Sequence, residues 1–435
     1  MKINKLLIGL MACSMSLTAC TATTNNTPTQ PTDNPATFPS ESTKPTNPTE
    51  SAESSEPTDE TGNTMNIDIG MYKNFVNKNE NWMFSPYSIK DAFSLLYNGT
   101  DGSVRNEFET VLGLNDKTVS AIRDYDASTK ASDTDSVKIA NRAYVSNDDE
   151  IRNTLNIDVL GLDEDEIKDL QIDNPKAAAE EINIFVSDTT NEKILNFITE
   201  DFIHDDTSLI LVNALYFNQA WDFDKGTITW NDGKQYKAFQ DKGYSLSNIK
   251  EVDDGNIDIL RLNYINDESD RNNYAMTIFC KSENATDNHV DQYFEALSDD
   301  KFMDIMNFNN YAGLKEYDKA EFYVPNFEFE NKYSLVKKLQ DMGMVDAFSS
   351  ADGFRKLGPV YISDVVHATY IKTDETGTEA AAATGIGMKT MSARVEEPKV
   401  KKVIANDTFV FVISDKNTDD ILFMGRVTQP TEIAG

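Results

Sequence analysis

The chain has 435 residues and a formal net charge of −33 at pH 7, from 73 acidic and 40 basic side chains. Sequence-independent binding to nucleic-acid phosphates needs a surface rich in lysine and arginine, so this charge excludes it and also disfavours anionic membrane surfaces. Hydrophobic residues make up 39% of the chain and aromatic residues 10%, which is enough for a sizeable core and excludes global disorder.

The amino terminus has the pattern of a secretory signal. Lys2 and Lys5 precede an apolar run at residues 6–15, and the run is too short to span a bilayer as a mature helix. The following Leu-Thr-Ala-Cys at residues 17–20 resembles the bacterial lipoprotein box, in which cleavage leaves an acylated cysteine. We therefore expect a signal peptide at residues 1–19, lipidation of Cys20, and a secreted protein that is lipid-anchored at the bacterial cell surface. Ordinary signal cleavage, which would leave Cys20 as a free thiol, is the alternative.

A low-complexity tract follows the signal. Residues 21–64 contain 13 threonines, 7 prolines and 5 serines, so the tract has too little apolar surface to offset its ordering entropy. We expect residues 20–64 to be the lipidated cysteine and its tether.

The remaining residues, 65–435, contain no second linker and no internal repeat, so we expect one domain. Apolar residues at helical spacing predict helices, and runs rich in Ile, Val, Phe and Tyr predict strands. The predicted helices are 88–96, 177–186 and 335–342, and the predicted strands are 137–145, 209–217, 274–279, 320–324, 409–413 and 421–423. Helices and strands do not alternate regularly, which favours the α+β class over a doubly wound sheet.

Nothing in the sequence selects an enzyme active site. GxSxG, P-loop and GxGxxG motifs are absent, and Gly385-Ile386-Gly387 lacks the third glycine. The acidic runs at 148–150 and 163–166 lack the spacing of an EF-hand and read as solvated surface. Paired carboxylates for glycoside hydrolysis stay open, but no pair is singled out. We predict a protein that is not an enzyme.

No metal or cofactor is expected either. The three cysteines have no CxxC spacing, and the three histidines are isolated, with none in HExxH. These residues are Cys13, Cys20, Cys280, His204, His289 and His367. We expect Cys280 to be a buried thiol in its predicted strand.

One stretch near the carboxyl end is unusual, the run DETGTEAAAAT at residues 374–384. Taken alone, Ala380 to Ala383 would favour one turn of helix, because alanine is the best helix former. Four further motifs change this interpretation. They are NWMFSPYSI at 81–89, LVNALYF at 211–217 followed by Trp221, VPNF at 324–327 followed by Leu339, Gly343, Met344 and Phe348, and LFMGRV at 422–427 followed by Pro430.

Together and in this order, the motifs resemble those of the serpins, inhibitors that trap serine proteases by inserting their own reactive loop into a β-sheet. The resemblance covers residues 65–435. It implies a fold of three β-sheets with a shell of helices and an exposed reactive-centre loop at about residues 375–405. It also implies a monomeric suicide inhibitor that forms a covalent acyl complex with a serine or cysteine protease. The negative charge argues against a heparin-type polyanion as cofactor.

The resemblance assigns three groups of site residues. The hinge, where insertion of the loop begins, matches Glu375, Gly377, Thr378, Glu379, Ala380, Ala381, Ala382, Ala383 and Thr384. The shutter, whose hydrogen bonds control parting of the central strands, matches Ser85, Ser88, Asn213 and His367, and the breach, the point of entry, matches Trp221. Side chains alternate in a strand, so Thr378 and every second residue after it would face the core, while the charged Glu379 would face outward.

The scissile bond follows from the family's register. Counting 17 residues from Glu375 gives Met391-Ser392, and an unbranched methionine suits the deep apolar pockets of elastase-, chymotrypsin- or subtilisin-like proteases. A shifted register would place Lys389 or Arg394 there and redirect the loop to trypsin-like enzymes. Thr408 stands where the family pattern has proline, and the stretch from Ser392 to Thr408 is long. A non-inhibitory serpin and a surface binding lipoprotein are the alternative functions.

Overall fold

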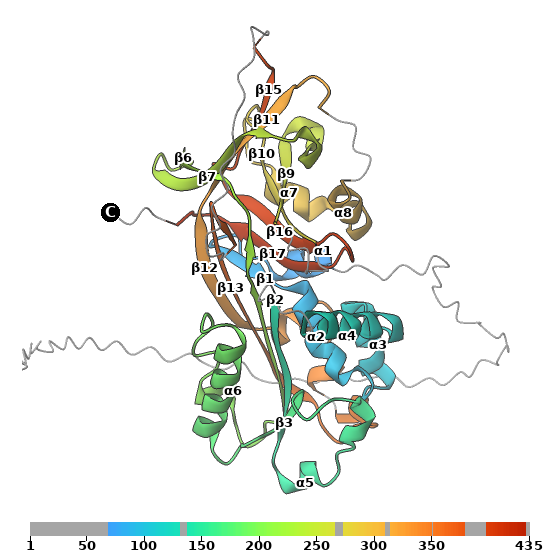
Figure 1. Cartoon of the computed structure of the whole chain (residues 1–435). Helices are drawn as coiled ribbons and strands as arrows, with labels where there is room; N and C mark the ends of the chain where they lie inside the picture. The colour runs from blue at the N-terminus through green and yellow to red at the C-terminus, as the bar shows by residue number, and fades with distance from the viewer. Residues whose placement is uncertain are drawn as a thin grey trace, which may run out of the picture. The chain divides into compact units, whose positions relative to one another are not determined.

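The computed structural model describes residues 68–130, 137–265, 273–308, 314–349, 351–378 and 397–431. The chain divides into two units, Met1–Glu60 and Thr61–Gly435, and all of the described residues belong to the second. These residues form three β-sheets and a set of helices (Figure 1), so the predicted α+β class with three sheets is confirmed.

The largest sheet has seven strands in the order β3-β2-β4-β13-β14-β5, with β12 also pairing with β13. Its strands are β2 (Val137–Ser146), β3 (Ile167–Leu170), β4 (Leu209–Phe217), β5 (Gln219–Ala220), β12 (Phe327–Ser334), β13 (Ile362–Asp374) and β14 (Gly377–Thr378). The two central strands, β4 and β13, pair in parallel from Leu209 with Ile362 to Leu215 with Thr369. Beyond this contact, β14 lies between β13 and β5 and is antiparallel to both.

Strand β4 explains why this sheet is the centre of the molecule. Every residue of LILVNALYF is buried, as expected for a strand that is covered on both faces. Side chains alternate along the strand, so Val212 and Ala214 pack with helix α6 (Pro175–Thr189), while Leu211 and Leu215 belong to the main core on the other face.

The other two sheets complete the core. The six-stranded sheet has the order β1-β17-β16-β10-β9-β8, and the four-stranded sheet has the order β15-β11-β7-β6. The first consists of β1 (Trp82–Phe84), β8 (Ile249–Val252), β9 (Ile257–Asn263), β10 (Tyr274–Lys281), β16 (Phe409–Asp415) and β17 (Ile421–Val427). The second consists of β6 (Asp224–Thr229), β7 (Gln235–Tyr244), β11 (Lys319–Pro325) and β15 (Val400–Ile404).

Helix α2 (Pro86–Tyr97) contacts β2, β4 and β17, and therefore joins two sheets. Its start is set by local chemistry, because the Ser85 hydroxyl accepts a hydrogen bond from the Ser88 amide at 3.0 Å and Pro86 occupies the first turn. The other helices are α1 (Asp68–Phe75), α3 (Gly102–Leu112), α4 (Asp116–Lys130), α5 (Asp149–Arg152), α7 (Val290–Ala296), α8 (Asp299–Met306) and α9 (Val336–Asp341). Short 3-10 turns occur at Ile157–Leu160, Glu200–Phe202, Leu246–Asn248, Asp253–Gly255, Asp346–Phe348 and Ala351–Phe354.

The elements predicted from the sequence are confirmed, with ends that differ by a few residues. The predicted helices correspond to α2, α6 and α9, and the predicted strands to β2, β4, β10, β11, β16 and β17. Two parts of the range expected for the reactive loop are strands, Gly377–Thr378 and Val400–Ile404. The stretch from Ser392 to Thr408 is long because it contains the whole of β15.

Candidate functional site

The first hinge residues already pair with the large sheet. Thr378 lies opposite Thr373 of β13 and Gln219 of β5, and its side chain is 1% exposed. Its hydroxyl is 2.7 Å from the Tyr264 hydroxyl. Gly377, which precedes it, has a φ of 148°, a backbone conformation that favours glycine. The hinge therefore enters the sheet at Thr378, a residue small enough to be fully buried there.

Trp221 holds the turn between β13 and β14. Its indole Nε1 donates to the Asp374 carbonyl at 2.7 Å, and its backbone amide donates to the Thr376 carbonyl at 2.9 Å. Its ring stacks on Tyr264, with the two ring centres 4.7 Å apart. The structure thus places Trp221 beside the hinge, where the sequence predicted the breach.

Glu375 forms the outer anchor of the hinge. Its carboxylate lies 3.0 Å from the ammonium of Lys225 on β6, and its carbonyl accepts from the amide of Phe223 at 3.1 Å. Burial favours the neutral carboxyl, but the hydrogen bond and charge of Lys225 outweigh it and leave the pKa of Glu375 below its usual value. Because Lys225 is largely exposed, water screens this ion pair.

The four predicted shutter residues come together where the start of α2 meets the central strands β4 and β13. The Ser85 amide donates to Nε2 of His367 at 3.1 Å, and Nδ1 of His367 contacts Oδ1 of Asn213. Burial lowers the pKa of His367 to about 3, so the ring is neutral and its single proton must sit on Nδ1. Nδ2 of Asn213 donates to the hydroxyl of Ser88 at 2.6 Å. Because Asn213 is on β4 and His367 on β13, their hydrogen bond crosses the seam between the two strands.

This network extends to residues that sequence reasoning missed. Asn213 also donates to Asn141 of β2, Asn141 donates to Asp91 of α2, and Asp91 shares a hydrogen bond with Asp126 of α4. Asp91 is 2% exposed. A signal was present in the sequence, since Asp91 follows Ser88 by three residues and so shares its helix face.

Strand β15, which follows the loop in the chain, is held in place by a buried ion pair. Lys401 of β15 is 3% exposed, and its ammonium lies 2.8 Å from Oδ1 of Asp258 on β9, which is fully buried. It also pairs with Glu251 of β8. Burial favours the neutral form of Asp258 and raises its pKa to about 6, although Lys401 opposes this. Lys401 therefore ties the four-stranded sheet to the six-stranded one.

The amino- and carboxyl-terminal motifs meet in the six-stranded sheet. Oδ1 of Asn81 accepts from the amides of Thr428 at 2.8 Å and Gln429 at 3.0 Å, while β1 pairs with β17. A side chain at Gly425 could not fit, because a Cβ would lie 2.3 Å from the Phe411 ring. Asn81 of the first motif and Gly425 of the last one are therefore needed for the contact between the two ends of the domain.

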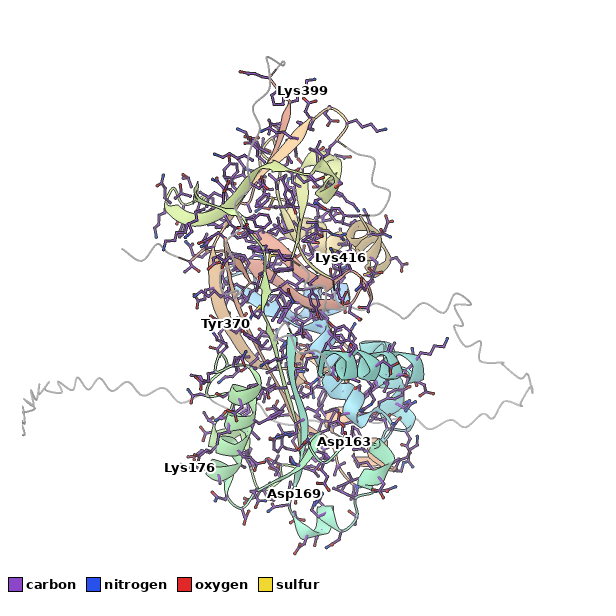
Figure 2. All side chains as sticks on the ribbon, viewed as in Figure 1. Asp163, Asp169, Lys176, Tyr370, Lys399 and Lys416 are labelled. Atoms are coloured by element: carbon purple, nitrogen blue, oxygen red, sulfur yellow. The ribbon has the colours of Figure 1, made fainter. Side chains whose placement is uncertain are left out.

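Part of the predicted site lies outside the described residues. These residues are Cys20, Glu379, Ala380, Ala381, Ala382, Ala383, Thr384, Lys389, Met391, Ser392 and Arg394. Figure 2 shows Lys399, just beyond the gap, at the opposite end of the domain from Asp169, with Tyr370 of β13 between them. The described ends of the loop, at Thr378 and Glu397, therefore bound a segment of 18 residues.

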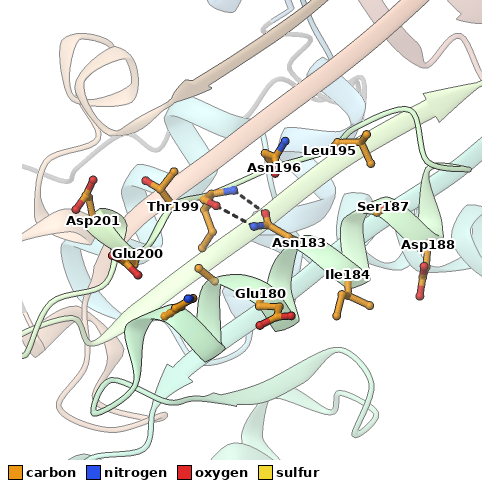
Figure 3. Close-up of a pocket in the computed structure, with 13 residues that line it drawn as sticks. Glu180, Asn183, Ile184, Ser187, Asp188, Leu195, Asn196, Thr199, Glu200 and Asp201 are labelled. Atoms are coloured by element: carbon orange, nitrogen blue, oxygen red, sulfur yellow. Dashed lines mark hydrogen bonds between the residues drawn. The ribbon is translucent and has the colours of Figure 1, made fainter. Parts of the chain in front are cut away.

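A groove of about 800 Å³ lies between α6 and the segment that follows it (Figure 3). Asn183 of α6 holds that segment by exchanging two 2.9 Å hydrogen bonds with the backbone of Ile198. Two exposed hydrophobic side chains, Ile184 and Leu195, line the groove. No hinge or shutter residue lines it, so the groove is separate from the candidate site.

Across the described residues, no group of three His, Cys, Asp or Glu side chains is placed to hold a metal ion. Among the helices of that same part of the chain, none is both long and apolar enough to cross a membrane. Cys280 is a buried free thiol, and burial raises its pKa, so it is protonated.

Comparison with known proteins decides the family. Residues 63–430 match the family model described as "Serpin (serine protease inhibitor)". The chain belongs to the serpin family. An uncharacterized serpin-like protein of Methanosarcina acetivorans is 30% identical over 370 residues, covering 81% of this serpin and 82% of the relative. Human Serpin B13 is 32% identical over 260 residues, covering 57% of this chain and 62% of that protein.

Solved structures agree with this serpin in fold. The native state of Tengpin, a thermophilic serpin, matches with a TM-score of 0.65 at 24% identity, covering 84% of this chain and 93% of that one. Serpin48 of the insect Tenebrio molitor matches with a TM-score of 0.66 at 21% identity, covering 84% and 96%. Serpins are protease inhibitors, so this protein belongs to a family of inhibitors and not of enzymes, as predicted.

Proposed function

We propose that this serpin is a suicide inhibitor of serine proteases that is cleaved at Met391-Ser392 and then inserts its loop between β4 and β13. The single observation that carries the proposal is the position of Thr378, which is small, buried and already paired at the entrance to the seam. In the sequence, the residues after it, Glu379 to Thr384, are one charged residue and a run of small ones, and strand alternation would turn the charge outward on insertion. Nothing bulky in that run opposes entry into the sheet.

The energetics also support insertion. About ten new backbone hydrogen bonds, each contributing roughly 1 kcal/mol net, would stabilise the inserted form on the order of 10 kcal/mol. This value is comparable to the stability of a whole domain. The native form must therefore be held by a kinetic barrier, and the bonds that cross the seam are a part of that barrier.

The methionine at position 391 directs the proposal toward elastase-, chymotrypsin- or subtilisin-like targets, since its unbranched side chain fits deep apolar pockets. The test is to incubate residues 65–435 with pancreatic elastase, chymotrypsin and subtilisin. We expect a covalent complex that resists denaturant, with cleavage after Met391 by mass spectrometry. Loop cleavage without a complex for every serine or cysteine protease tried would instead favour a non-inhibitory serpin.

The register has its own test. Met391→Arg is expected to move inhibition toward trypsin, because arginine matches a pocket that carries a negative charge. An unchanged target spectrum would show that the scissile bond lies elsewhere, with Lys389 and Arg394 the next positions to examine. Met388→Leu, three residues upstream, keeps an apolar side chain on the face expected to turn inward and serves as the matched control.

We also propose that acylated Cys20 anchors the protein at the bacterial cell surface and that residues 21–64 tether the inhibitor to the membrane. The support is the signal-like sequence before Cys20 and the composition of the tract. Stable anchoring needs more than one acyl chain, which this type of cysteine modification supplies. Cys20→Ala is expected to release the protein from the membrane fraction, whereas retention of the variant would contradict the anchor.

A further inference from the structure

The shutter network ends in two neighbouring carboxyl groups, one buried and one half-buried. Asp91 of α2 is 2% exposed and Asp126 of α4 is half-buried. The two side chains are hydrogen-bonded, and Asn141 donates to Oδ2 of Asp91. The Tyr87 hydroxyl donates to Oδ1 of Asp126 at 2.9 Å.

The direction of each hydrogen bond along this network determines the protonation state of Asp91 and Asp126. The Ser85 amide donates to His367, His367 to Asn213, Asn213 to Asn141, and Asn141 to Asp91. Asn213 also donates to Ser88, but each of these four bonds has its donor on the side away from the acids, and Tyr87 donates to them from the other side. A hydrogen bond between two carboxyl groups needs one proton, because two carboxylates offer only acceptors. Asp91 is the more buried of the two, so the neutral acid is Asp91 and the ionised partner is Asp126.

We propose that Asp91 and Asp126 share one proton that positions Asn141 and thereby keeps the sheet closed, so that loss of this proton loosens the closed sheet. Asp91 and Asp126 are positioning residues, because they act on the seam only through Asn141 and Asn213. The pair lies where α2 and α4 meet β2, and β2 and β4 lie on the same side of the seam. A second negative charge in this position would push α2 and α4 apart.

The other charged groups around the pair do not supply enough positive charge for Asp91 and Asp126 to be ionised together. Burial and the charge of Asp126 raise the pKa of Asp91 well above its usual value, while Asn141 and the guanidinium of Arg123 on α4 act in the opposite direction. Arg123 is itself 3.6 Å from the carboxylate of Glu166. Burial and the neighbouring acids also raise the pKa of Tyr87, so this side chain stays a neutral donor.

The sign of the pH dependence follows from these facts. An acid whose pKa is higher in the native form contributes stability that is complete below the unfolded pKa of about 3.9 and is lost as pH rises through the native pKa. For one proton, the ratio of closed to unfolded protein falls about tenfold per pH unit within this window. The acid pair therefore stabilises the closed sheet more in mild acid than in alkali. Other titrating groups add their own contributions to this dependence.

The test compares the full chain with Asp91→Asn, whose side chain can accept from Asn141 and donate to Asp126 without titrating. We expect the urea midpoint of the native form, followed by tryptophan fluorescence, to contain a part that falls with rising pH in the unchanged protein, opposed below about pH 6.5 by the buried His367. Asp91→Asn should lose this part of the slope and have a higher midpoint at alkaline pH. Asp124→Asn, an exposed acid on the same helix, is the matched control and should behave like the unchanged protein.

An infrared spectrum reports the protonation state of Asp91 directly. A side chain with a purely structural role would give no such signal. A buried neutral Asp91 predicts a carboxylic-acid C=O band near neutral pH that is absent from Asp91→Asn and present in Asp124→Asn. Asp126→Asn removes the neighbouring charge but leaves Asp91 buried, so the slope should move to lower pH, and this shift tests the pair even if Asp91→Asn fails to fold. Equal pH slopes in all variants, or no acid band, would overturn the proposal. These readouts use no protease, so failure of inhibition would not affect them.

Discussion

The imidazole Nδ1 of His367 on β13 donates a hydrogen bond to Oδ1 of Asn213 on β4, and the two residues are register partners in the parallel pair. A strand inserted between β4 and β13 must break this bond. If the loop inserts as proposed, this bond is a physical barrier across its path, and the strength of the bond depends on the protonation of one buried ring.

The first prediction concerns acid. Burial lowers the pKa of His367 to about 3 in the native form, whereas an unfolded histidine titrates near 6.5. The resulting stability is complete above about pH 6.5 and is lost as pH falls toward about 3, at roughly 1.4 kcal/mol per pH unit. We expect this titration to lower the urea midpoint as pH falls, against the opposite contribution of Asp91 over part of the same range. His367→Gln should remove this slope, whereas His204→Gln, at an exposed position, should retain it.

The second prediction concerns Thr378, which is buried at the entrance to the seam. Thr378→Arg would place a charge where burial of an unpaired ion is strongly unfavourable, so insertion should slow. We expect the protease to cleave this variant as a substrate, with the yield of covalent complex reduced at least about tenfold. Thr378→Ser keeps a small hydroxyl and should inhibit normally. Full complex formation by the arginine variant would show that insertion does not pass through this position.

The third prediction concerns Trp221. Trp221→Phe keeps an aromatic ring against Tyr264 but removes the 2.7 Å hydrogen bond to the Asp374 carbonyl. We expect a loss of about 1–2 kcal/mol in the free energy of unfolding, together with faster deuterium exchange in residues 374–378. Trp82→Phe changes a buried indole on β1 and should leave that exchange unchanged. Unaltered exchange in the Trp221 variant would contradict its role in holding the hinge turn.

The fourth prediction concerns the ion pair on β15. Lys401→Met leaves the buried Asp258 without its 2.8 Å partner, and breaking such a pair typically costs about 3–5 kcal/mol. The double variant with Asp258→Asn should recover part of that loss, because no uncompensated charge stays buried. Lys402→Met, an exposed change on the same strand, should have little effect. Equal thermal midpoints for the Lys401 and Lys402 variants would contradict the assignment.

Local patterns were sufficient to predict the central part of the fold. The apolar run at 209–217 predicted β4, because a strand that is buried on both faces is apolar at every position. The apolar residues at helical spacing in 88–96 predicted α2, because a helix that is buried on one face repeats its apolar residues every three or four positions. Strand β12, FEFENKYS, alternates polar and apolar residues and was missed, as was α4, whose mean hydropathy is low. The alternation in β12 is the signal of a half-buried strand and could have identified it, whereas α4 depends on packing against α2 and β2.

The candidate site also contains residues that the sequence predicted and residues that it did not. Ser85, Ser88, Asn213 and His367 belong to motifs, and they converge as the resemblance implied. Asn141 and Asp91 lie in no such motif, and their role depends on β2 and α4 being placed around α2. No pattern along the chain encodes that three-element contact, so only the structure could identify the acid pair.

Strand direction at the seam has an energetic consequence for this serpin. β4 and β13 are parallel, whereas β14 is antiparallel to both β13 and β5. A segment that continued β14 along the seam would replace one parallel ladder with two antiparallel ladders. Parallel pairing is slightly less stable per residue than antiparallel pairing. The present structure therefore keeps a less favourable parallel pairing at the centre of its largest sheet, and replacement of this pairing by two antiparallel ones would be one part of the driving force for the proposed insertion.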